Sequence, residues 1–182
     1  MNTINSYESA MTTIVDIDLE LNKMYAEIIP GRKLPACINN TALDTLLAKA
    51  QNVFSSLVRP QHADELDMER YYSLCITLYC VAESLFDSHV LLARSDKKRA
   101  HFGWNQKDSS ACASVEESIN NMLEDAGEDA EVAVLRPMFT NEGIVGHAVD
   151  PYIAFAGECA KRVIAEFPSR CIKLDGYTAM LI

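Results

Sequence analysis

The sequence is poor in glycine and proline and contains a single tryptophan. Its 182 residues include 7 Gly and 6 Pro. Folds made of many short strands need frequent turns, and Gly and Pro are the main turn-forming residues. The low content therefore favours few, long elements. Hydrophobic residues make up 49% of the chain and charged residues 23%, which is the composition of an ordinary globular domain. We expect residues 1–182 to form one domain.

Long hydrophobic runs are also missing. The most apolar stretch, YYSLCITLYCVA at 71–82, contains no charge, but it falls well short of the roughly 20 residues that a membrane-spanning helix needs. Glu83 and Asp87 follow it closely and would lie inside the bilayer at considerable cost. The stretch therefore predicts a helix in the protein core, and we expect no membrane association.

Positive charge is scarce. The chain has 16 Lys and Arg against 26 Asp and Glu, which gives a formal net charge of −10. Proteins that bind duplex nucleic acid usually carry an excess of basic residues, so we expect no direct binding to duplex DNA. An acidic surface instead suits a basic partner, metal ions, or simply solubility.

Recognisable ligand-binding motifs are absent as well. The six cysteines form no CxxC pair, and no Cys/His set has zinc spacing. No glycine-rich phosphate loop, nucleophile elbow or metalloprotease helix is found. The opening residues MNTINSYESA have no basic region followed by an apolar run, so they predict no secretory signal. These absences predict a cytoplasmic protein without a cofactor or a bound metal.

What the sequence does contain is helical periodicity. Apolar residues recur at spacings of three and four in segments 6–29, about 40–58, about 64–94 and 150–167. The third segment is apolar on nearly all sides over 71–82, which is typical of a helix surrounded by others. In the first segment the apolar seam has heptad spacing, which suits a partner helix from the same chain or from a second copy. Self-association through this helix is therefore also expected.

The remaining segments carry weaker signals. A capping box at Ser114 predicts a further helix that ends near Gly127. Residues 128–136 predict a short helix, with a strand over 132–135 as the alternative, and 138–149 are expected to be irregular. The pair Asp175-Gly176 favours a hairpin at about 170–181. The predicted fold is all-α, a single-domain bundle of five or six helices around a buried central helix at about 64–94. The hairpin at about 170–181 is an optional addition to this fold.

The central helix also carries a stripe of carboxylates: Glu65, Glu69, Glu83 and Asp87. At 100° per residue they share one face as two i,i+4 pairs, and such pairs can hold Mg²⁺. The pattern resembles the acidic helix pairs of all-α nucleotide pyrophosphohydrolases, which implies Mg²⁺-dependent nucleotide hydrolysis. Those enzymes place the pairs on two packed helices. Here one helix would separate them by about 27 Å, so the alternative is a set of solvated or hydrogen-bonded side chains.

A second chemical candidate is the segment RSDKKRAH, from Arg94 to His101. An arginine followed by a histidine after several residues resembles the signature of HEPN-type helical ribonucleases. The resemblance implies RNA cleavage, with Arg94 stabilising the phosphate and His101 acting as acid or base. Ser95 departs from the polar Asn, Asp or His that more often follows the arginine in that family. The alternative interpretation is a solvated basic loop.

The third feature is a run of negative charge from Asp108 to Leu135, which contains no Lys or Arg. Like charges repel unless they meet solvent or a cation. The run therefore predicts a docking surface for a basic groove, including one that normally holds nucleic acid. The leading hypothesis is a non-enzymatic interaction protein, an inhibitor or adaptor with a basic protein partner. We name its predicted partner-binding residues the acidic segment: Glu116, Glu117, Glu124, Asp125, Glu128, Asp129 and Glu131.

Overall fold

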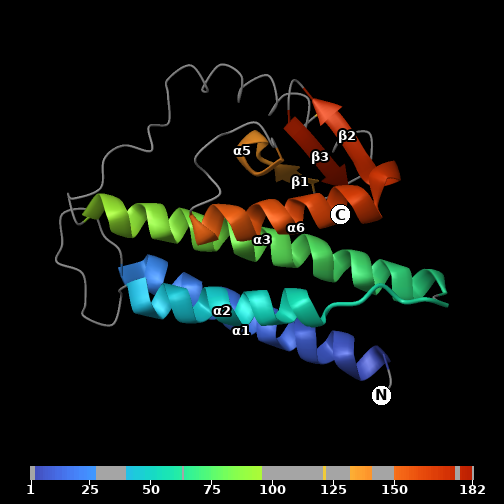
Figure 1. The fold of residues 1–182 in the computed structure, drawn as a ribbon, viewed down its shortest axis with the longest axis horizontal. Helices are drawn as coiled ribbons and strands as arrows, with labels where there is room; N and C mark the ends of the chain where they lie inside the picture. Colours follow the sequence, from blue (N-terminus) through green and yellow to red (C-terminus); the bar gives the residue numbers. More distant parts are fainter. Residues whose placement is uncertain are drawn as a thin grey trace.

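The computed structural model describes residues 3–27, 40–62, 64–95, 121, 132–140, 150–174 and 177–181. Within these ranges the chain is mostly helical, with a small three-stranded sheet near the C-terminus (Figure 1). The predicted helix from Ser114 to Gly127, apart from Asn121, lies outside the described residues. So do most of the predicted connection at 95–113 and the part of the predicted irregular segment from 141 to 149.

Four long helices occupy the segments in which periodicity predicted them. They are α1 (Thr3–Glu27), α2 (Asn40–Ser56), α3 (Glu65–Ser95) and α6 (Pro151–Glu166). Figure 1 shows α1 and α2 on one side of α3 and α6, while the sheet lies on the other side. The helix α3 packs against α1, α2 and α6.

Helix α1 is amphipathic, and its apolar seam faces the rest of the chain. Tyr7, Ile14, Ile17 and Leu21 are all buried, as expected for residues spaced by three and four on one helical face. The seam contacts α2 and α3. The surface that was predicted to attract a partner helix is therefore covered by helices of the same chain, and a second copy would have to use another face of α1.

Helix α3 begins at a cap and then runs through the core. The side chain of Asp64 accepts a hydrogen bond from the backbone N–H of Asp67 at 2.8 Å, which satisfies one of the free donors at the helix start. Most of the uncharged stretch at 71–82 is buried, with Cys80 as the exposed member. No helix in the described ranges is both long and apolar enough to cross a membrane.

Helix α6 starts and stops where its sequence predicts. Asp150 accepts hydrogen bonds from the N–H groups of Tyr152 and Ile153 at 2.9 and 3.4 Å, and Pro151 takes the first helical position, where its missing N–H costs nothing. On its inner face, Ala156 and Ala160 have no exposed surface. Small side chains at these positions let the backbone of α6 approach α3 closely, and the two helices pack extensively.

The described residues are mostly helical, as expected, but near the C-terminus they form a three-stranded sheet, which is one strand more than the predicted hairpin. Strand β1 (Val132–Leu135) pairs with β3 (Tyr177–Leu181), and β3 pairs with β2 (Cys171–Leu174), both antiparallel, in the order β1-β3-β2. The predicted hairpin is confirmed by the pairing of β2 with β3. The predicted helix at 128–136 is wrong over 132–135, where the strand alternative holds.

The physical reason lies in the partner strand. The run Val-Ala-Val-Leu suits a half-buried strand, but a strand needs a neighbour, and β3 follows far along the chain. In the sheet Val134 opposes Ala179, with no gap in the register. The turn α5 (Pro137–Thr140) follows β1, so the expectation of irregular structure at 138–149 is also wrong over residues 138–140. Pro137 favours this short helix because its fixed φ suits a first helical position.

Burial of the thiols and phenols predicts a loss of stability in base. Burial raises the pKa of the Cys75 thiol to about 11 and raises the pKa of Tyr79 well above its usual range, with help from the charge of Glu83. These groups stay neutral in the folded chain. Their contribution to the free energy of unfolding is therefore complete below pH 9, the ordinary pKa of a thiol. It is lost progressively as pH rises toward 11, where the unfolded chain ionises first.

We therefore expect the urea midpoint of unfolding to be steady up to about pH 9 and to fall between about pH 9 and 11. Absorbance at 295 nm gives an independent check, because it reports ionised tyrosine. The buried phenols should ionise only together with unfolding. If all tyrosines titrated near pH 10 while the helical circular dichroism signal persisted, the burial of these side chains would be contradicted.

Candidate functional site

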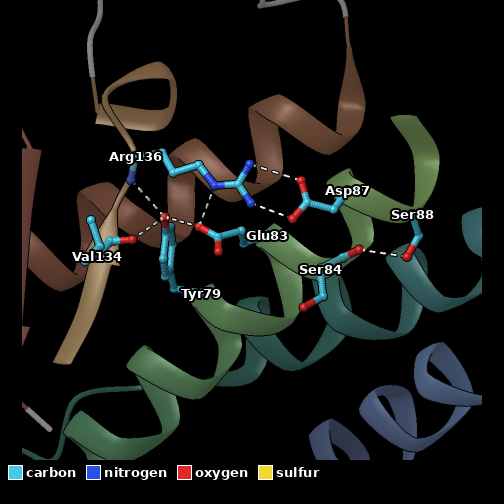
Figure 2. A network of polar contacts seen from close by, with 7 residues as sticks. All are labelled: Tyr79, Glu83, Ser84, Asp87, Ser88, Val134 and Arg136. Atoms are coloured by element: carbon cyan, nitrogen blue, oxygen red, sulfur yellow. Dashed lines mark hydrogen bonds and ion pairs between the residues drawn. The ribbon is translucent and has the colours of Figure 1, made fainter. Parts of the chain in front are cut away.

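The most organised polar cluster joins α3 to the residue that follows β1. Glu83 and Asp87 lie one turn apart on α3, and Arg136 reaches both from the end of the strand (Figure 2). The two terminal nitrogens of Arg136 contact the two carboxylate oxygens of Asp87, the Nη1–Oδ1 distance being 3.0 Å. Its Nε lies 3.1 Å from Oε2 of Glu83. The planar guanidinium thus binds both carboxylates, a geometry that lysine cannot reproduce.

Tyr79 completes this network from one turn earlier on α3. Its hydroxyl lies 2.8 Å from Oε2 of Glu83 and 3.3 Å from the carbonyl oxygen of Val134. The backbone N–H of Arg136 donates to the same hydroxyl oxygen at 3.1 Å. The Tyr79 hydroxyl therefore links α3 to the backbone of the sheet on either side of Leu135 (Figure 2). We call Tyr79, Glu83, Asp87 and Arg136 the Arg136 cluster.

The electrostatics of the Arg136 cluster favour a permanent ion pair. Only 17% of the Arg136 side chain is exposed. Burial disfavours its positive charge, but the hydrogen bonds to Asp87 and the charges of Glu83 and Asp87 outweigh this effect and raise the pKa of Arg136 above its ordinary value. The arginine stays charged at every accessible pH and neutralises one of the two carboxylates. Its role in the described structure is to hold elements together.

The other predicted carboxylate pair is also drawn into structural contacts. Arg170 forms an ion pair with Glu69 and places its guanidinium 4.0 Å from the ring centroid of Tyr72. Glu65 is exposed at the first turn of α3. A magnesium ion bound by Glu83 and Asp87 would have to displace Arg136. Among the described residues, no group of three or more His, Cys, Asp and Glu side chains is arranged to hold a metal ion.

A second polar cluster ties three helices together. His89 on α3 lies with Nε2 3.6 Å from Oδ2 of Asp150, and its ring stacks on Tyr152 with a centroid distance of 4.3 Å and an interplanar angle of 11°. The Tyr152 hydroxyl donates to Oδ1 of Asp44 at 2.7 Å. Through these contacts α3, the cap of α6 and the N-terminal part of α2 meet at one end of the helices, which is a packing role.

Most of the residues predicted to act in catalysis or in partner binding lie outside the described part of the chain. Arg94 lies in the last turn of α3, with its side chain undescribed, and His101 lies beyond the described residues. The whole acidic segment does so too. The structure therefore brings Glu83 and Asp87 together around Arg136 and separates them from Glu65 and Glu69. It does not test whether Arg94 lies near His101, and it does not describe the acidic segment.

Sequence analysis missed Arg136, although two signals pointed to it. Arg136 is the single basic residue between Lys107 and Lys161. Two carboxylates one turn apart on a core helix also need a cation nearby, because burial of unpaired charge is costly. Together these signals could have predicted the pairing.

No protein-family model, curated protein sequence or solved structure gives a significant match to this chain.

Proposed function

We propose that this chain is a non-enzymatic interaction protein, an inhibitor or adaptor, that presents the acidic segment to a basic protein partner. The observation that carries the proposal is the charge pattern. From Asp108 to Leu135 the chain has eight acidic and no basic residues, within a molecule of net charge −10. Concentrated charge of one sign steers an oppositely charged partner and raises its association rate.

The described contacts support different roles for the carboxylates of α3 and those of the acidic segment. Glu83 and Asp87 are taken up by Arg136, and Glu69 by Arg170, so the carboxylates that could have formed a catalytic set already serve packing. The acidic segment leads directly into β1, which is an edge strand of the sheet. The C-terminal end of the acidic segment is therefore next to β1 in sequence. The residue after β1, Arg136, binds Asp87 of α3.

Charge reversal in the acidic segment is the direct test. A pull-down from the native host at low and high salt would identify the partner, and the complex should weaken steeply with salt. We expect Glu124→Lys with Asp125→Lys to reduce affinity at least ten-fold in a titration at low salt. Glu65→Lys with Glu158→Lys is the matched control. It changes the net charge equally, at two exposed positions of α3 and α6, and should change affinity by less than about three-fold.

A complex that tolerates both reversals equally would contradict the proposal. The enzyme alternatives have their own assays. Mg²⁺ with nucleotides should produce no thermal shift, and the chain should cleave RNA no faster than its His101→Ala variant. A shift that disappears in Glu83→Gln, or cleavage that depends on His101, would replace the proposal with the corresponding enzyme.

A further inference from the structure

The face of α1 that points away from the core carries two large apolar side chains. Val15 is 46% exposed and Leu19 is 51% exposed. They lie four residues apart and therefore sit next to each other on the helix surface. Ile14 and Ile17, which neighbour Val15 in sequence, are almost completely buried. The helix thus has a second apolar patch, on the side opposite the seam, and no described element packs over it.

Acidic side chains surround this patch. Glu8, Asp16, Asp18 and Glu20 are all exposed, and none of them forms an ion pair with another described residue. Lys23 is the single basic residue of α1. In Figure 1, α1 lies at the edge of the molecule away from the sheet, with α2 and α3 on its inner side. The outward face of α1 is therefore an apolar pair within a field of negative charge.

We infer that this outward face binds an amphipathic helix of a basic protein, with apolar residues against Val15 and Leu19 and flanking Lys or Arg residues against the carboxylates. Helix-on-helix recognition uses apolar anchors spaced by three and four residues, and the charges complement a basic partner. The inference rests on the proposed function for the class of partner. It adds a second set of contact residues, which are separate in sequence from the acidic segment.

Charge complementarity also selects against other occupants. A second copy packed through the same face would bring the carboxylates of Asp16, Asp18 and Glu20 near those of the other copy, and such like charges repel each other. An anionic lipid surface attracts basic segments and would repel this one. A basic amphipathic segment satisfies both the apolar pair and the carboxylates.

A designed peptide tests this surface without the native partner. The probe is a helical peptide of about three heptads with Leu at a and d and Lys at e and g, labelled for fluorescence anisotropy and titrated with the full chain. Val15→Ser with Leu19→Ser should weaken binding at least ten-fold. The matched control is Val58→Ser with Leu66→Ser, which removes two other exposed apolar side chains, at 67% and 57% exposure. It should change binding by less than two-fold.

The remaining outcomes separate this inference from the proposed function. Equal loss in both double variants, or binding that depends on Glu124 and Asp125 but not on Val15 and Leu19, would overturn the α1 surface and leave the acidic segment in place. Absence of peptide binding at low salt would also overturn it, since the probe carries every feature that the face requires. A dimer in sedimentation analysis that Val15→Ser with Leu19→Ser dissociates would replace the basic helix with a second copy.

Discussion

Replacing Arg136 with methionine is expected to lower the free energy of unfolding by about 2–3 kcal/mol. The substitution leaves Glu83 and Asp87 close together without their cation and removes the ion pairs that join α3 to the residue after β1. Breaking a fully buried ion pair costs about 3–5 kcal/mol. We expect less here because the Asp87 side chain is 35% exposed and the Glu83 side chain 28%, which lets water screen part of the repulsion. Urea unfolding followed by circular dichroism measures the change.

Two controls show whether the loss comes from uncompensated charge. Arg59 pairs with Glu166 at 2.9 Å, but its side chain is 54% exposed, so Arg59→Met should cost less than about 1 kcal/mol. Adding Glu83→Gln and Asp87→Asn to Arg136→Met should recover a large part of the loss, because neutral amides do not repel each other. Equal effects of Arg59→Met and Arg136→Met would mean that the Arg136 cluster contributes no more than a surface pair.

Replacing Ile14 with alanine should lower the free energy of unfolding by about 3 kcal/mol. Ile14 has no exposed surface, and truncating a buried Ile to Ala typically costs 2–5 kcal/mol through lost transfer energy and the cavity left behind. The neighbouring residue Val15 is 46% exposed, so Val15→Ala should cost no more than about 0.5 kcal/mol. Adjacent positions on one helix thus differ in effect because Ile14 faces the core and Val15 faces solvent.

The same pair of variants also tests where the seam of α1 packs. If it packs within the chain, the destabilisation by Ile14→Ala is independent of protein concentration. A loss of stability that grew on dilution would show that Ile14 lies between two copies instead. Measurements over a hundred-fold range of concentration distinguish the two outcomes.

The helical part of the fold was predictable because its signals are local. The spacing of Tyr7, Ile14, Ile17 and Leu21 predicted the buried face of α1, and Asp150-Pro151 predicted the start of α6, where the carboxylate is found accepting two backbone N–H groups. The Asp175-Gly176 pair predicted the hairpin of β2 and β3. In each case the residues that decide the structure are near neighbours in sequence.

The remainder depends on contacts between distant segments. Strand β1 exists because Val132 and its neighbours find β3, a pairing that no local pattern announces. Arg136, the partner of Glu83 and Asp87, is likewise far away in sequence. In the sequence it is simply the polar residue that ends the short apolar run at 132–135. Periodicity showed that the carboxylates share a stripe of α3, but it could not tell a metal ligand from an arginine partner. That choice needs the position of Arg136.

The pairing of β1 with β3 has a consequence for the order of folding. Val132 meets Leu181, and α5 and α6 lie between the two strands along the chain. Bringing such distant residues together costs closure entropy before any contact rewards it. Docking of α6 onto α3 shortens the span that remains to be closed. We therefore expect the helical layers to assemble early and the strands to pair last. The ion pairs of Arg136 with Glu83 and Asp87 should form in one of the final steps.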